Sequence, residues 1–179
     1  LDPIEGERGA QPWALTPEAY GKFLCGLFDV YYRDWVNGDY TSVRLFDDYI
    51  HMAMGMPAGT CATSGSCGAY FVVEGDGTGY PCDFYCLDEW EMGRIGEQSI
   101  PELANSEKAR LFLQQGERKP DACADCRWYS LCHGGCKRDW VENDGKLENY
   151  SCLAFKEFFA YAESRILEIA RAEAEYYRR

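Results

Sequence analysis

The apolar positions of residues 16–37 recur at the spacing of a helix. Thr16 is suited to the N-cap, Pro17 to the first helical position, and Gly38 to the C-terminal stop. This pattern predicts an amphipathic helix that packs one face against a core. The apolar face is formed by Tyr20, Phe23, Leu24, Leu27, Phe28 and Tyr31.

A second helical repeat occupies the end of the chain. From Asn149 onward the sequence predicts one long helix with a continuous apolar face and charged residues opposite. The apolar face is formed by Phe155, Phe158, Phe159, Ala162, Ile166, Ile169 and Ala170.

The middle of the chain predicts shorter elements. Residues 45–54 favour a short helix, and residues 99–116 favour a helix that begins at Pro101 with a second helical turn after it. Between them, "AYFVVEGDGTGYPC" places a glycine-rich turn between two extended pieces, which indicates a β-hairpin. The expected fold class is therefore α+β.

Composition and charge exclude several classes of protein. With 46% hydrophobic residues the 179-residue chain is globular in composition, and no apolar run of about 18 residues exists that would span a membrane. The first residues show neither part of a signal peptide, so we expect a cytoplasmic protein. They also lack an initiator Met, so we expect a piece of a longer protein. The net charge of −12 argues against a nucleic-acid partner.

Ten cysteines are the main candidates for chemistry, and four of them fall within "CADCRWYSLCHGGC", residues 123–136. Five disulfides are one interpretation, but Cys-x2-Cys pairs rarely meet disulfide geometry without strain. Two-residue gaps suit two thiolates that bind one metal centre. Zinc and [4Fe–4S] clusters both accept four thiolates, so the spacing favours iron and sulfur but leaves both metals open.

Seven cysteines and a glycine carry a resemblance to a known family. The pattern is Cys67-x9-Gly77-x4-Cys82, a gap, Cys-x2-Cys-x5-Cys-x3-Cys from Cys123, a gap, and then Cys152. It resembles the signature of SPASM domains, the auxiliary-cluster domains at the C-terminus of certain radical S-adenosylmethionine enzymes.

Two further features resemble one group of these enzymes, the anaerobic sulfatase-maturating enzymes. They are an extra cysteine, Cys61, and the stretch Cys-Asp-Phe-Tyr from Cys82 to Tyr85. The resemblance covers roughly residues 12–160. It implies that residues 1–60 are the tail of a radical-SAM partial barrel with linker helices, that residues 61–152 form the SPASM domain, and that residues 153–179 form a C-terminal helix.

The resemblance also implies the metal ligands. It implies two [4Fe–4S] clusters that organise the hairpin and the cysteine-rich loops. Cluster I would be held by Cys61, Cys67, Cys82 and Cys136, and cluster II by Cys123, Cys126, Cys132 and Cys152.

The implied activity is oxidation of a sulfatase cysteine or serine to Cα-formylglycine. Such a reaction needs S-adenosylmethionine and a third [4Fe–4S] cluster with an open iron. The motif Cys-x3-Cys-x2-Cys for that cluster is absent from this chain. Cys82 and Cys86 have the spacing of its first two cysteines, but the third position is Glu89. We therefore expect these residues alone to be inactive, and we expect a sulfatase polypeptide and an N-terminal radical-SAM domain as partners.

Asp83 is the candidate catalytic base, because by resemblance the aspartate after the hairpin cysteine has that role. An ordinary Asp, with a pKa of about 3.9, is a poor match for a thiol near about 8.5. The negative charge of a nearby cluster, together with burial, would raise the pKa of Asp83.

Two other interpretations remain open at this point. One is another SPASM enzyme that modifies peptides, for example by forming thioether or carbon–carbon links. The other is a stand-alone electron-transfer module or a zinc-stabilised binding module. Among the remaining residues, we expect Cys25 and Cys86 to be core thiols and His51 to be a packed histidine. The aromatic residues around the dense loop are expected to shield a cluster from water, and they are Trp128, Tyr129 and Trp140.

Overall fold

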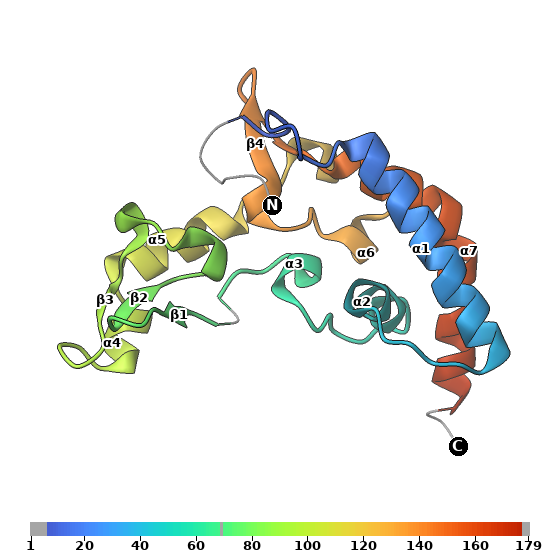
Figure 1. The fold of residues 1–179 in the computed structure, drawn as a ribbon, viewed down its shortest axis with the longest axis horizontal. Coiled ribbons are helices and arrows are strands. Elements are labelled where there is room, and N and C mark those ends of the chain that lie inside the picture. The colour runs from blue at the N-terminus through green and yellow to red at the C-terminus, as the bar shows by residue number, and fades with distance from the viewer. Residues whose placement is uncertain (1–6, 69, 177–179) are drawn as a thin grey trace.

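The structure is a computed structural model that describes residues 7–68 and 70–176. Figure 1 shows a helical group on one side and a group of short strands and helices on the other, with cysteine-bearing segments between them. The helical group consists of α1 (Pro17–Asn37), α2 (Arg44–Ala53) and α7 (Cys152–Tyr176). The other group consists of β1 (Val72–Val73), β2 (Thr78–Tyr80), β3 (Gly93–Arg94), α4 (Ile100–Ala104) and α5 (Glu107–Glu117).

The helical group surrounds the main core. α1 and α7 lie side by side, and α2 packs against α7 (Figure 1). As expected, the Thr16 side chain caps α1, and Gly38 ends it with a left-handed φ of 82°. One part of the expected apolar face is wrong, because the Phe23 side chain is 56% exposed. No helix in the described part of the chain is both long and apolar enough to span a membrane. The core is formed by residues that include Leu24, Phe28, Tyr31, Phe46, Tyr49, Phe158, Phe159 and Ile166.

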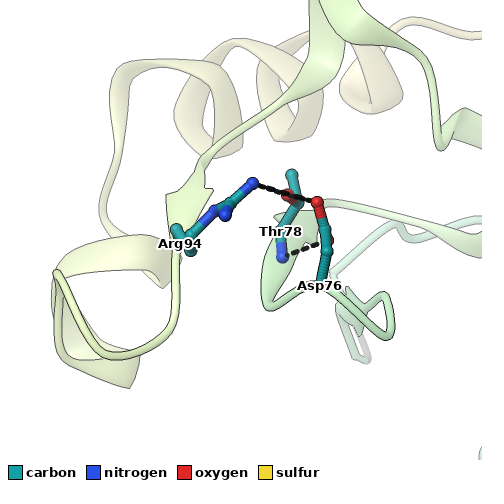
Figure 2. A network of polar contacts seen from close by, with 3 residues as sticks. All are labelled: Asp76, Thr78 and Arg94. Atoms are coloured by element: carbon teal, nitrogen blue, oxygen red, sulfur yellow. Dashed lines mark hydrogen bonds and ion pairs between the residues drawn. The ribbon is translucent and has the colours of Figure 1, made fainter.

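The expected hairpin is present and extends into a three-stranded antiparallel sheet. Val72 pairs with Tyr80 and Thr78 with Arg94, in the order β1-β2-β3. The Asp76 carboxylate accepts hydrogen bonds from the Thr78 amide and hydroxyl, each at 2.9 Å (Figure 2). It also forms an ion pair with Arg94 at 3.0 Å. These contacts attach the hairpin turn to β3. The sequence pattern did not predict this third strand.

A second hairpin was missed by the sequence analysis. β4 (Trp140–Asn143) pairs with β5 (Lys146–Asn149) through the turn residues Asp144 and Gly145, whose φ angles are 48° and 75°. Two positive φ angles are typical of a type I′ turn, for which Asp-Gly is a favoured sequence. Because this hairpin uses the residues before Ser151, α7 begins at Cys152 and not at Asn149.

The remaining elements are single turns that carry or flank cysteines. The arrangement of helices with two small sheets confirms the α+β class, while the division at residues 60 and 152 stays a prediction. The single turns are α3 (Cys61–Ser64), η1 (Asp83–Tyr85), η2 (Asp88–Trp90), η3 (Asp121–Cys123), α6 (Tyr129–Cys132) and η4 (Lys137–Asp139).

Candidate functional site

Four cysteines that are distant in sequence line one cavity of about 240 Å³, here called the first cavity. Cys61 begins α3, Cys67 lies in the loop after it, Cys82 precedes η1, and Cys136 precedes η4. The structure thus brings together all four cysteines of the expected cluster I. Each is a half-buried free thiol.

The turn that carries Cys61 is attached to α2 through a buried carboxylate. Asp48 is only 3% exposed and accepts hydrogen bonds from the Gly59 amide at 2.8 Å and the Thr60 hydroxyl at 2.7 Å. It also accepts one from the Thr63 hydroxyl at 2.5 Å. Burial alone would raise the pKa of Asp48, but these hydrogen bonds outweigh it and lower the pKa. Asp48 therefore positions the turn that carries Cys61 without lining the cavity itself.

The other expected ligand set lines a larger second cavity of about 1040 Å³. Cys123, Cys126 and Cys132 come from the dense loop, and Cys152 comes from the N-terminus of α7. Trp128 lines the same cavity, and its indole Nε1 is buried with no hydrogen-bond partner among the described residues. A buried N–H of this kind requires an acceptor.

A left-handed turn separates the two cysteines that face different cavities. His133, Gly134 and Gly135, which stand between Cys132 and Cys136, have φ angles of 49°, 87° and 68°. A Cβ atom on Gly135 would lie 2.6 Å from the side-chain nitrogen of Asn149. A side chain at Gly135 therefore requires Asn149 to move, and backbone of this kind favours glycine.

The β4–β5 hairpin and α3 hold this turn in place. The Gly134 carbonyl accepts hydrogen bonds from Asn149 Nδ2 at 2.8 Å and Trp140 Nε1 at 2.9 Å. His133 Nδ1 lies 2.8 Å from the Thr63 carbonyl oxygen. His133 thus connects the dense loop to the turn that carries Cys61, a role that the sequence did not indicate.

Several thiols of the two cavities lie in an environment that disfavours unpaired thiolates. Burial, as the largest cause, raises the pKa of Cys82 and of Cys132 to about 12 and that of Cys136 to about 11. Metal ligands are thiolates, so a positively charged centre must compensate for this cost. Among the described residues, no three His, Cys, Asp or Glu side chains are arranged to hold a single metal ion.

Lys137 follows Cys136 directly and places its ammonium among three aromatic rings. Its Nζ lies 3.9 Å from the ring centre of Phe112 and 4.9 Å from those of Tyr85 and Trp90. Burial lowers the pKa of Lys137 to about 8, although nearby thiolates act in the opposite direction. The sequence pattern around Lys137 does not indicate this position.

Asp83 stands beside the first cavity on η1, next to Cys82. Its Oδ1 accepts hydrogen bonds from the Tyr70 hydroxyl at 2.7 Å and from the Cys82 thiol at 3.3 Å. The Tyr70 hydrogen bond is the largest cause of a lowered pKa for Asp83, and the side chain is exposed. Burial acts to raise the pKa of Asp83, but the hydrogen bonds outweigh it. The combined effect of burial and a cluster charge stays a prediction.

The two cysteines set aside in the sequence lie outside both cavities. Cys25, on α1, is half-buried and packs against the main core. Cys86 packs against the cluster that contains Tyr80 and Trp90, and its thiol lies 3.7 Å from the Cys82 carbonyl oxygen. Neither lines the first or the second cavity. His51 is half-buried and lines a third cavity beside α2.

Comparison with known proteins identifies the family of the cysteine-rich segment. Residues 65–127 match the SPASM family, described as an iron-sulfur cluster-binding domain. The resemblance to SPASM domains is confirmed. Two cysteines of each cavity fall within these residues, Cys67 and Cys82 of the first and Cys123 and Cys126 of the second. Cys61, Cys132, Cys136 and Cys152 lie outside them.

Curated relatives extend the similarity over nearly the whole chain. The chain is 40% identical over 172 residues to the cysteine-type anaerobic sulfatase-maturating enzyme of Clostridium perfringens strain 13. The aligned region covers 95% of this chain and 46% of the relative. It is 38% identical to the enzyme of the same type from Clostridium novyi, over 97% of this chain and 47% of the relative. A serine-type relative from Bacteroides thetaiotaomicron is 29% identical over 88% of this chain. The chain spans about half the length of the cysteine-type relatives.

Solved structures agree with these relatives. The structure of native anSMEcpe with bound AdoMet and the Kp18Cys peptide matches 96% of this chain and 48% of its own, with a TM-score of 0.89 and 40% identity. The structure with AdoMet and the Cp18Cys peptide gives a TM-score of 0.88 over the same shares. The fold described above is therefore that of about half of each of these chains.

Proposed function

We propose that this chain binds two [4Fe–4S] clusters, one in each cysteine cavity. The observation that carries this proposal is that each expected set of four cysteines lines a cavity of its own. The ligands would be Cys61, Cys67, Cys82 and Cys136 in the first cavity and Cys123, Cys126, Cys132 and Cys152 in the second.

The residues of each cavity fit such a group. In both cavities four thiols face the same space, which is the complete ligand set of a [4Fe–4S] cluster. In the second cavity, the buried and unpartnered Nε1 of Trp128 would find its acceptor in a sulfur atom. When bound, clusters of this type accept and donate single electrons.

We further propose that the chain is part of an anaerobic sulfatase-maturating enzyme, which oxidises a sulfatase Cys or Ser to Cα-formylglycine. The names of the relatives support this activity, and the relative of known structure that holds a peptide together with AdoMet supports a polypeptide substrate. S-adenosylmethionine and a third cluster would be bound by residues outside this chain.

In this reaction Asp83 would take the proton of the substrate thiol or hydroxyl. Its neighbour Cys82 places the carboxylate at the edge of the first cavity, and Tyr70 fixes the orientation of the carboxylate by the bond to Oδ1. The same hydrogen bond keeps the carboxylate ionised, since it lowers the pKa of Asp83. An oriented carboxylate that is exposed to an incoming peptide has the position of a general base. Its lowered pKa makes it a weaker base than an ordinary Asp, so this role requires the negative charge of the proposed cluster to raise the pKa.

The test of this role is Asp83→Asn in the full-length enzyme, with a sulfatase peptide as substrate. We expect formylglycine formation to fall by about 100-fold to 10,000-fold, the usual contribution of a general base, with iron content unchanged. Asp88→Asn is the matched control, because Asp88 is an exposed carboxylate on the next turn, and it should keep wild-type turnover. Wild-type turnover in Asp83→Asn removes Asp83 from the mechanism.

The same assay separates the alternative activities. Mass spectrometry of the peptide would show a thioether or carbon–carbon link instead of formylglycine if the enzyme belonged to another SPASM class. A colourless protein with zinc in place of iron and sulfide would indicate a zinc-stabilised binding module.

A further inference from the structure

The wall of the first cavity contains a cation that none of the roles above uses. Arg138 and Asp139 also line this cavity, but their side chains form an ion pair at 3.4 Å. Lys137 forms no ion pair with a carboxylate in the part of the chain that the structure describes. We propose that the Lys137 ammonium is the fixed counter-charge of the first cluster and raises the reduction potential of that cluster.

This inference rests on the proposed function, which places a cluster in the first cavity. It concerns a positioning residue, because Lys137 acts on the electrons of the site through its charge and contacts no substrate. Its new content is that one lysine makes one of the two clusters easier to reduce.

The aromatic rings fix the position of the ammonium. Tyr85, Trp90 and Phe112 pack edge to face against each other with ring centres 5.0 to 5.8 Å apart. The faces of aromatic rings attract cations, and each ring lies within the distance at which this attraction is significant. The Phe112 carbonyl oxygen accepts a hydrogen bond from Lys137 Nζ at 3.4 Å. The charge is therefore held in one place and does not extend into solvent.

Geometry assigns Lys137 to the first cavity. Lys137 lines this cavity together with all four of its cysteines, and it follows Cys136 directly in the chain. Lys137 also lines the second cavity, but Cys136 and Phe112, the ring closest to its Nζ, line only the first of the two. Lys119, by contrast, acts on thiols of both sites, Cys67 and Cys123.

The sign of the effect follows from the charge of the cluster. An oxidised [4Fe–4S] core with four thiolates carries a net charge of about −2, and one added electron makes it about −3. A neighbouring cation stabilises the more negative state more strongly, and in a partly buried site this interaction is weakly screened. Lys137 therefore favours the reduced cluster, next to the carboxylate that would take the substrate proton.

The experiment compares reduction potentials in the anaerobically prepared holoprotein. Redox titrations followed by electron paramagnetic resonance are recorded for wild type, Lys137→Met, Lys137→Gln and Lys137→Arg. The signal of the first cluster is assigned by its loss in Cys82→Ser. Lys108→Met is the matched control, because it removes the same charge from an exposed position on α5. Iron and sulfide are quantified in every variant.

We expect the first cluster of Lys137→Met and Lys137→Gln to be at least tenfold harder to reduce. For a one-electron couple this corresponds to a fall of about 59 mV. The potential of the second cluster should stay near the wild-type value in every variant. The potential of the first cluster should also stay near it in Lys137→Arg and Lys108→Met. Lys137→Met and Lys137→Gln lack the positive charge, and Lys137→Arg keeps it. Loss of the first cluster in both uncharged variants but not in Lys137→Arg would therefore also support a role for the charge of Lys137.

Two outcomes overturn the proposal. One is an unchanged potential of the first cluster in uncharged variants that retain their iron. The other is equal loss of the first cluster in all three variants, including Lys137→Arg, which would assign Lys137 a packing role. A wild-type protein without clusters would instead contradict the proposed function, so the two failures are distinguishable.

Discussion

The two cysteine cavities are assembled in different ways. The first takes its cysteines from four segments spread over residues 61–136, whereas the second takes three from residues 123–132 and one from the start of α7. The first is also the smaller, at about 240 Å³ against about 1040 Å³. Segments far apart in sequence lose more chain entropy when they are brought together. The first site therefore depends on tertiary packing, and the second depends mainly on a local loop.

A short turn makes the two sites one unit. Cys132 lines the second cavity and Cys136 the first, and the left-handed residues between them set the direction of each. The hydrogen bonds from Asn149 and Trp140 to Gly134 hold this turn against the second hairpin. A change at the turn should therefore affect both sites, whereas a change at Asp48 should affect the first.

Removal of iron should produce the largest effect. Because each cluster would connect distant segments, we expect the apoprotein to lose its structure between residues 61 and 152. α1 and α7 should remain helical, since their contacts belong to a core that includes Phe28 and Phe158 and has its own buried aromatic packing. Hydrogen exchange read by mass spectrometry would show fast exchange in the first region and continued protection in the helices.

The outcome that contradicts this expectation is unchanged protection of residues 61–152 after the metal is removed. Equal loss of protection in α1 and α7 would show instead that the helical group has no stability of its own. The control is the same protein after reconstitution with iron and sulfide, which should recover the original pattern.

Asp48→Ala should destabilise the first site without removing a ligand. Hydrogen bonds to a charged group contribute about 1.5–3 kcal/mol each and are not additive, so we expect a loss of roughly 2–4 kcal/mol in the free energy of unfolding. Because the pKa of Asp48 is lowered in the folded state, its contribution is present above the ordinary Asp pKa and is lost as pH falls through the lowered value. Chemical denaturation of the holoprotein at neutral and acidic pH measures both effects.

The exposed Asp125→Ala serves as the control and should leave stability unchanged. We expect the difference between Asp48→Ala and wild type to shrink as the pH is lowered. A pH-independent difference would show that the carboxylate charge does not contribute.

Gly135→Ala should produce a smaller loss. A left-handed backbone costs a non-glycine residue about 1–3 kcal/mol, and here the new methyl group would also displace Asn149. Gly26→Ala is a control of opposite sign, because Gly26 lies in α1 with open space around it and alanine gains about 0.5–1 kcal/mol in a helix. Equal stability of Gly135→Ala and wild type would mean that the turn is not restrictive.

The parts of the fold that were predictable are those that depend on local sequence. The caps at Thr16 and Gly38 and the apolar repeat of α7 are local signals, and the structure contains them nearly as expected. The β4–β5 hairpin was missed although Asp144-Gly145 is a strong local signal for a type I′ turn. The strands on either side of it, β4 and β5, have only four residues each and lack the alternating apolar pattern that is typical of a strand.

The supporting residues of the sites were not predictable from one sequence. Asp48 and Lys137 look like ordinary charged residues, and their roles arise from segments that meet only in the fold, such as Thr60 and Phe112. Asp83 was named through the family resemblance, but its partner Tyr70 lies 13 positions away, in another segment. Cysteine spacing indicates which residues share a site, and tertiary structure supplies the charges around them.

Quantification of iron and sulfide in anaerobically prepared protein tests the central claim most directly. Two [4Fe–4S] clusters require about eight iron and eight sulfide ions per chain. We expect Cys82→Ser and Cys126→Ser each to retain about four of each ion, and Cys86→Ser to retain all of them. Bound zinc, or a wild-type content of about four iron ions, would contradict two separate cluster sites.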